Sequence, residues 1–163
     1  MSEDSSTTAS TNGDGRQKKT ENKNGHVQIT AQYIRDLSFE CPNIEHLISG
    51  PGDNPNLNVE INVNAKQIDE SIYQSEIEFS ATASSEKKVI YELELIYSGI
   101  FKLDGIPKET LEPLLLVNCP TILFPFMRRI VADLTRENGF PPLFLEPIDF
   151  AGLYIQRKKQ EAE

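Results

Sequence analysis

Alternating apolar and polar residues predict four β-strands in the first two thirds of the chain. The clearest run spans residues 57–65, where Leu57, Val59 and Ile61 face one way and the asparagines and Glu60 between them face the other. A period of two is typical of a strand with one buried face. Similar runs predict strands at 27–40 with a bulge near Ile34, at 73–81 and at 89–103.

After Val117 the apolar period changes from two residues to about four. Leu123, Met127 and Val131 recur at helical spacing, which predicts an amphipathic helix. Asn118 is expected to cap this helix, and Pro125 is expected to bend it or to delay its regular part until Phe124.

The end of this helix and the start of a second one also have clear signals. Gly139 followed by Phe140 and two prolines predicts the helix end. Asp149 is expected to cap a second helix that carries Phe150, Leu153 and Tyr154 and ends in basic residues.

Strands followed by helices predict an α+β domain, an antiparallel meander with helices on one face. Residues 1–25 contain only Met1 and Ala9 as apolar residues, so we expect a disordered N-terminal tail. The folded domain is expected at 26–157, followed by a flexible C-terminal tail at 158–163.

Charge narrows the function classes. The chain has 163 residues and a formal net charge of -9, and the bases of the N-terminal tail cancel its acids. An acidic folded part disfavours binding to nucleic acid or to an anionic membrane. No signal segment or membrane-spanning run is recognisable, so cytoplasmic residence and no membrane insertion are expected.

The sequence also shows no recognisable arrangement of catalytic residues. Only two histidines are present, and Cys41 and Cys119 lie far apart with no metal-ligand spacing. No glycine-rich phosphate loop is recognisable, since Gly13-Asp14-Gly15 lies in the expected disordered tail. We therefore expect no enzyme, no cofactor and no metal site.

Two features could carry a binding function. The polar strand face is rich in carboxylates, which suits a solvated surface or a docking site for a basic partner. Loops and helix edges carry a surplus of apolar residues, for which core and subunit contacts compete with a binding site. The apolar residues are Ile44, Leu47, Ile48, Phe126, Leu143, Phe144, Phe150, Leu153 and Tyr154.

Several segments together resemble the protein-export chaperone family SecB, over residues 26–156. The matching segments are Ser38–Asn43, Gly99–Phe101, Cys119–Phe126 with Arg128, Gly139–Leu143 and Pro147–Phe150. The resemblance implies a bacterial cytoplasmic protein with a four-stranded antiparallel sheet, two main α-helices packed on one face, and assembly as a homotetramer, a dimer of dimers.

The resemblance also implies two sites. Members of the family bind the motor ATPase SecA through an acidic sheet surface, and they hold unfolded precursors in an apolar groove. The matching SecA-binding positions are Asp36, Glu40, Glu92 and Glu94, although the family commonly has an apolar residue at Glu92. The expected client-binding residues are Ile44, Leu47, Ile48, Phe126, Phe150, Leu153 and Tyr154, and the expected subunit contacts are Leu93, Leu95 and Tyr97.

These expectations describe an ATP-independent holdase that keeps secretory precursors unfolded and delivers them to SecA. Two alternatives remain open at this stage. One is an acidic adaptor that binds a folded basic partner without chaperone activity. The other is an enzyme or carrier that takes a small ligand in the apolar cleft.

Overall fold

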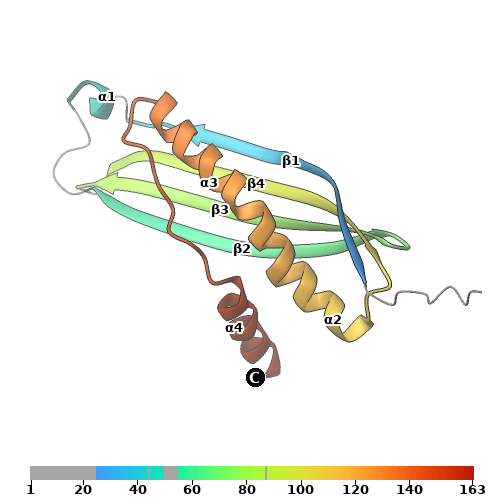
Figure 1. Cartoon of the computed structure of the whole chain (residues 1–163). Helices are drawn as coiled ribbons and strands as arrows, with labels where there is room; N and C mark the ends of the chain where they lie inside the picture. The colour runs from blue at the N-terminus through green and yellow to red at the C-terminus, as the bar shows by residue number, and fades with distance from the viewer. Residues whose placement is uncertain (1–24, 44, 50–54, 87) are drawn as a thin grey trace, which may run out of the picture.

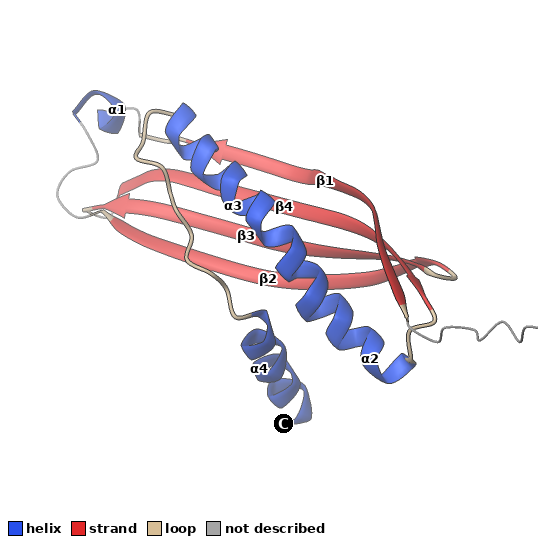
Figure 2. Cartoon of the chain, in the orientation of Figure 1, coloured by secondary structure: helices blue, strands red, loops and turns tan. Residues whose placement is uncertain are grey.

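The protein consists of a four-stranded antiparallel sheet with helices on one face (Figures 1 and 2). This computed structural model describes residues 25–43, 45–49, 55–86 and 88–163, so the expected tail at 1–25 lies outside it apart from Gly25. The strands are β1 (His26–Glu40), β2 (Asn56–Asp69), β3 (Ile72–Ser85) and β4 (Lys88–Asp104). The helices are α1 (Glu45–Ser49), α2 (Lys108–Pro113), the π-helical η1 (Leu114–Asn118), α3 (Cys119–Glu137) and α4 (Phe150–Ala162). The predicted fold class is confirmed.

The strand order is β1-β4-β3-β2, which corrects the prediction of a plain meander. Strands β2, β3 and β4 follow one another as expected, but β1 pairs with β4 and not with β2. Local alternation tells which face of a strand is buried, but it does not identify the neighbouring strand. As a result, β1 and β2 are the two edges of the sheet.

Two register shifts in β1 change the direction of its side chains. One lies between Ile34 and Asp36, as predicted, and the other between Ile29 and Ala31. After the shift between Ile34 and Asp36, Leu37 lies opposite Leu95 on the helix-covered face, whereas Asp36 lies opposite Ile96 on the open face. The bulges therefore let an acidic residue of β1 join the open face.

The core lies between α3 and the two central strands. Leu123, Met127 and Val131 of α3 are each 0% exposed and pack against the sheet. Leu93, Leu95 and Tyr97 belong to this same core, with exposures of 0, 1 and 7%. The three residues expected at a subunit contact are thus covered within one chain and leave almost no surface for a second chain.

Gly99 permits the close approach of α3. A β-carbon at this position would lie 2.8 Å from Cδ2 of Leu123 and 2.7 Å from Cε2 of Phe101. β4 keeps its register with β3 through Gly99, but its register with β1 shifts one residue further on, because Ala31 pairs with Ile100 and Ile29 with Phe101. The glycine thus provides space for α3 beside a bulge, as the sequence suggested, although the extra residue of that bulge belongs to β1.

The long helix begins earlier than the sequence predicted. It starts at Lys108 and is continuous through η1 into α3, and Asn118 is helical with no capping bond from its side chain. The amide of Cys119 donates to the carbonyl of Leu114, five residues earlier, which is the spacing of a π-helix. At the same spacing the carbonyl of Leu115 would need the amide of Pro120, but proline has no N–H. The Ser75 hydroxyl of β3 donates to the Leu115 carbonyl at 2.8 Å and supplies the missing hydrogen bond.

This continuous helix, Lys108–Glu137, is long and apolar enough by length and composition to span a membrane. No such run was recognised from the sequence. Its apolar stripe is nevertheless occupied by the sheet, as expected for the core helix of a globular domain. The helix ends as predicted, with Gly139 at a φ of 85° and the Phe140 amide bonded to the Thr135 carbonyl.

Helix α4 begins at the predicted cap, where Asp149 Oδ1 accepts a hydrogen bond from the Gly152 amide at 2.9 Å. It runs to Ala162, so the expected flexible tail at 158–163 is helical almost throughout. Phe150 is its only buried residue. Apolar packing therefore contributes little to the attachment of this helix to the rest of the domain.

Polar contacts supply the remaining attachment of α4. Lys158 Nζ lies 2.8 Å from Glu112 Oε1 of α2, and the Tyr154 hydroxyl donates to Glu112 Oε2 at 3.2 Å. The hydrogen bond from Lys158 is the main cause that lowers the pKa of Glu112, and the same bond raises the pKa of Lys158. Glu112 thus stabilises the docked helix while it is ionised.

Replacing Leu123 tests the core. Leu123→Ala removes a fully buried side chain and should lower the free energy of unfolding by roughly 2–5 kcal/mol, measured by chemical denaturation. Arg128→Ala, an exposed change on the same helix, is the control and should have little effect. A loss below about 1 kcal/mol for Leu123→Ala would contradict the placement of this residue in the core.

The attachment of α4 should depend on pH through Glu112. Because folding lowers the pKa of Glu112, its contribution is present above its unfolded pKa and is lost as pH falls through the folded value. Amide exchange should show that Glu112→Gln reduces protection of α4 at neutral pH and flattens its acid dependence. Glu161, whose pKa is also lowered, supplies the dependence that remains.

Glu109→Gln on the same helix is the matched control, because no ion pair involves Glu109 among the described residues. It should leave the exchange of α4 unchanged. Equal effects of the two substitutions would show that Glu112 does not hold α4 in place.

Candidate functional site: an acidic face and an apolar groove

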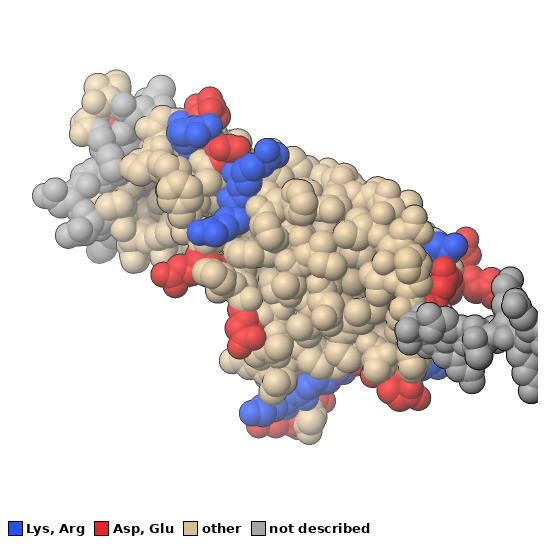
Figure 3. All heavy atoms as spheres, viewed as in Figure 1, with Lys and Arg blue, Asp and Glu red and all other residues tan. Residues whose placement is uncertain are grey.

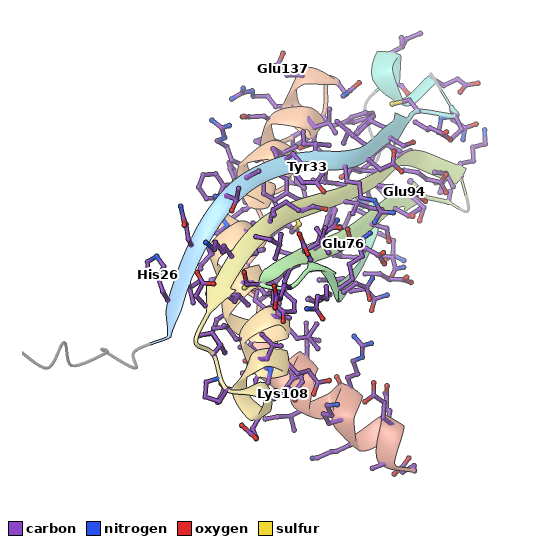
Figure 4. All side chains as sticks on the ribbon, turned by 90° about the vertical axis from the view of Figure 1, so that its right-hand side faces the viewer. His26, Tyr33, Glu76, Glu94, Lys108 and Glu137 are labelled. Atoms are coloured by element: carbon purple, nitrogen blue, oxygen red, sulfur yellow. The ribbon has the colours of Figure 1, made fainter. Side chains whose placement is uncertain are left out.

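The four acidic residues predicted to bind SecA lie together on the open face of the sheet. Glu40 of β1 is directly opposite Glu92 of β4, and Glu94 is opposite Ser38. Asp36 is one pair further along, opposite Ile96, and all four acidic residues are exposed. Figure 4 shows the sheet from its side, with α3 on one side and Glu94 toward the other.

Two further carboxylates extend this surface across the sheet. Glu60 of β2 and Glu78 of β3 line a shallow hollow of about 330 Å³ together with Asp36 and Glu94. Like charges on neighbouring strands repel one another, so this arrangement reduces stability unless a cation offsets it. The open face therefore presents carboxylates from all four strands to solvent or to a basic partner.

One acid of this face is neutralised within the chain. Arg35, at the second bulge of β1, contacts both carboxylate oxygens of Glu76 at 2.7 and 2.8 Å. Gln74 and Ser98 also donate to Glu76, so this buried carboxylate is fully hydrogen-bonded. The bonds to Glu76 are the main cause that raises the pKa of Arg35. Glu76 is therefore part of the structure of the sheet, whereas the other acids of this face form no ion pair within the part of the chain that the structure describes.

An apolar groove lies on the other side of the sheet, between the edge strand β2 and α4. Two adjoining hollows form it, of about 400 and 440 Å³, and they share Ile61, Leu153 and Gln156. Val59 and Ile148 make the first hollow mainly apolar. The second hollow is mixed, because Val63, Leu116 and Tyr154 share its lining with Asn62, Asn64 and Gln160. The structure thus places Leu153 and Tyr154, as predicted for a groove, on its helical wall.

Among the described residues, Ile48, Phe126 and Phe150 do not line this groove. Phe150 is only 3% exposed and packs edge-on against Phe124, so it belongs to the core. Phe126, 46% exposed, follows Phe124 by two positions, which turns it by about 200° toward the opposite side of α3. Ile48 is 86% exposed on the short helix α1, while Ile44 and the Leu47 side chain lie outside the described residues.

Phe126 instead belongs to a second apolar surface on the β1 side of α3. There, side chains of β1 that face the helix layer are left partly uncovered, next to exposed residues of α3. We call this the β1–α3 surface, formed by Val27, Ile29, Ile34, Leu37, Ile122 and Phe126, each 37–46% exposed. Figure 3 shows that the middle of the helix-bearing face has few charged side chains, which gather toward its ends.

The sequence interpretation missed the strand wall of the groove. Val59, Ile61 and Val63 were assigned to the buried face of β2, yet Val59 remains 37% exposed. The signal was present in the sequence, because five alternating apolar residues in an edge strand exceed what one helix covers. Glu60 and Glu78, which also lie on the acidic face, are not among the residues predicted to bind SecA.

The two thiols are not placed for chemistry. Burial raises the pKa of Cys119 to about 12 and also raises that of Cys41. A thiol with a raised pKa is a poor nucleophile and a poor metal ligand. Within the described ranges, no three His, Cys, Asp or Glu residues are grouped to hold a metal ion.

Comparison with known proteins agrees with this architecture. The family model described as "Preprotein translocase subunit SecB" matches residues 19–161. A protein-export protein SecB from Xanthobacter autotrophicus is 40% identical over 144 residues, 88% of this chain and 92% of its own length. The SecB of Afipia carboxidovorans is 43% identical over 135 residues, covering 83% of this chain and 84% of the relative.

A solved structure supports the fold. The SecB-like chaperone Rv1957 of Mycobacterium tuberculosis, in complex with a peptide from the antitoxin HigA1, matches with a TM-score of 0.60 at 18% identity. The match covers 75% of this chain and 90% of that chain. The match to the family model over residues 19–161 and the relatives near 40% identity show that the chain belongs to the SecB family.

Proposed function

We propose that this chain is an ATP-independent chaperone that holds unfolded secretory precursors in the groove between β2 and α4 and delivers them to SecA. The observation that carries the proposal is the apolar groove beside an unpaired strand edge. Its relatives are export proteins, and the SecB-like relative of known structure was solved with a bound peptide. The protein acts by binding alone, in the cytoplasm of a bacterium.

The shape of the groove suits extended polypeptide more than a compact small molecule. It is open and follows the strand, whereas pockets for small ligands enclose most of the ligand surface. Apolar walls accept many side chains, so specificity for sequence should be loose. Such binding favours the unfolded state of the client and delays its folding.

The acidic open face supplies the second half of the proposal, a docking site for a basic segment of SecA at Asp36, Glu40, Glu92 and Glu94. This face and the groove lie on opposite sides of the sheet, so both can be occupied together. An acidic surface speeds association with a basic partner and makes it sensitive to salt.

A dimer of dimers needs two different interfaces, and one of them is proposed to form through the β1–α3 surface. Contiguous apolar residues of this kind mark contacts between proteins. Assembly through this surface leaves the β2 edge and its groove free. Four grooves in one particle would raise the effective concentration of binding sites along one client chain.

Replacing Leu153 with a charge should weaken the holdase. Leu153 lines both hollows, so in Leu153→Glu a bound client either buries the new charge or is kept out of the groove. We expect client affinity to fall on the order of tenfold or more, measured as loss of the delay in refolding of a slow-folding precursor without nucleotide.

Ile155→Glu is the control, because Ile155 lies on the same helix, is 55% exposed and lines neither hollow. It should retain the delay. Absence of any delay with the unmodified protein would overturn the chaperone proposal and favour the adaptor alternative.

Removing two carboxylates should weaken SecA binding and leave the fold intact. For Asp36→Ala with Glu40→Ala, we expect roughly tenfold weaker binding at low salt, with the difference shrinking as salt rises. Glu109→Ala with Glu146→Ala removes equal charge from exposed positions outside the acidic face and is the matched control. Unchanged affinity of the first variant at low salt would exclude Asp36 and Glu40 from the docking site.

A further inference from the structure

The groove does not end at the second hollow. A third hollow of about 320 Å³ continues along β2 past Val63, lined by Ala65, Gln67, Tyr73 and Leu111 among others. It shares Asn64, Leu116 and Arg157 with the second hollow. The three hollows thus form one path beside the edge strand, and the Arg157 side chain lies at the boundary between the second and the third.

Two bonds hold Arg157 across this path. Its Nη1 donates to the backbone carbonyl of Val63 at 3.0 Å, and its Nε donates to Glu161 Oε1 at 3.1 Å. The Val63 carbonyl belongs to the outer edge of the sheet, since it accepts from a helix that lies beyond β2. The guanidinium therefore bridges from α4 to the strand edge and crosses the groove.

The occupied carbonyl is one of a series. In an antiparallel ladder every second residue points both its N–H and its C=O to the same side of the strand. The N–H and C=O groups of Ile61 and Val59 therefore point outward, like those of Val63. The side chains of these residues line the groove. On the Val59 side of Arg157 an extended segment meets open backbone groups and apolar walls, but at Val63 it meets a carbonyl that is already bonded.

We propose that Arg157 closes the client groove at Val63 and so determines how long a polypeptide segment it accepts. The inference rests on the proposed function, because it assigns a limit to the same groove. Arg157 is here a specificity-determining residue, with Glu161 as the residue that positions it. Segments alongside 57–63 fit, and longer ones must leave the strand edge or displace the guanidinium.

A simple anchoring role for Arg157 makes a different prediction. An anchor would hold α4 for clients of any length, so its loss would change all affinities alike. A closure affects only those segments long enough to pass it. The dependence of affinity on segment length therefore separates the two roles.

The experiment uses the full chain and labelled peptides with alternating apolar and polar residues. One probe has about seven residues, which matches the strand from 57 to 63, and others have about four more at either end. With the unmodified protein the long and short probes should bind equally. With Arg157→Ala one long probe should gain on the order of tenfold over the short one, because it gains the freed carbonyl and the third hollow.

Lys159→Ala is the matched control, an exposed basic residue of the same helix with no ion pair among the described residues. It should behave as the unmodified protein, and Arg157→Lys should restore part of the limit because an ammonium can donate to the same carbonyl. Equal affinities of all probes for Arg157→Ala, or equal losses for all, would overturn the closure. Binding of no probe to the unmodified protein, with no delay of precursor refolding, would overturn the proposed function as well.

Discussion

The width of one helix against the width of the sheet determines where this protein has binding surfaces. A helix with its side chains is about 10–12 Å across, whereas four strands at about 4.8 Å spacing span nearly twice that. Helix α3 packs on β3 and β4, the central strands, through Leu123, Met127 and Val131. The apolar faces of β1 and β2 on either side are therefore left partly uncovered.

These two uncovered margins have different neighbours. Beside β2, helix α4 stands off the sheet and is attached through Glu112, so the space between strand and helix remains a groove, which the Arg157 side chain crosses at Val63. Beside β1 the described chain places no helix, and the uncovered residues continue directly into the exposed side of α3. A groove suits an extended client, and a continuous apolar surface suits another copy of the chain.

The opposite face of the sheet follows from the same strands. Alternation that sends apolar residues toward α3 sends Glu60, Glu78 and Glu94 the other way, where none of the described helices covers them. Among the described residues, Glu76 is the only acid of this face with an ion pair. An external cation would relieve the repulsion among the other acids, which is the physical argument for the proposed basic partner.

The sequence by itself determined the elements, because hydrophobic period, caps and breakers act locally. It predicted four strands, the bulge near Ile34, the end at Gly139 and the cap at Asp149, and it placed the acids of the open face correctly. The resemblance to SecB identified the family and drew attention to Leu153 and Tyr154.

Only the tertiary structure decided which residues share a surface. The pairing of β1 with β4 depends on contacts distant in sequence, and so does the π-helical segment, whose free carbonyl is satisfied by Ser75 of β3. Phe150 and Leu93 are large apolar residues of the kind that binding sites use, but both are buried within their own chain. Arg157 looked like an ordinary basic helix end, and its role depends on the strand edge that the fold places beside it.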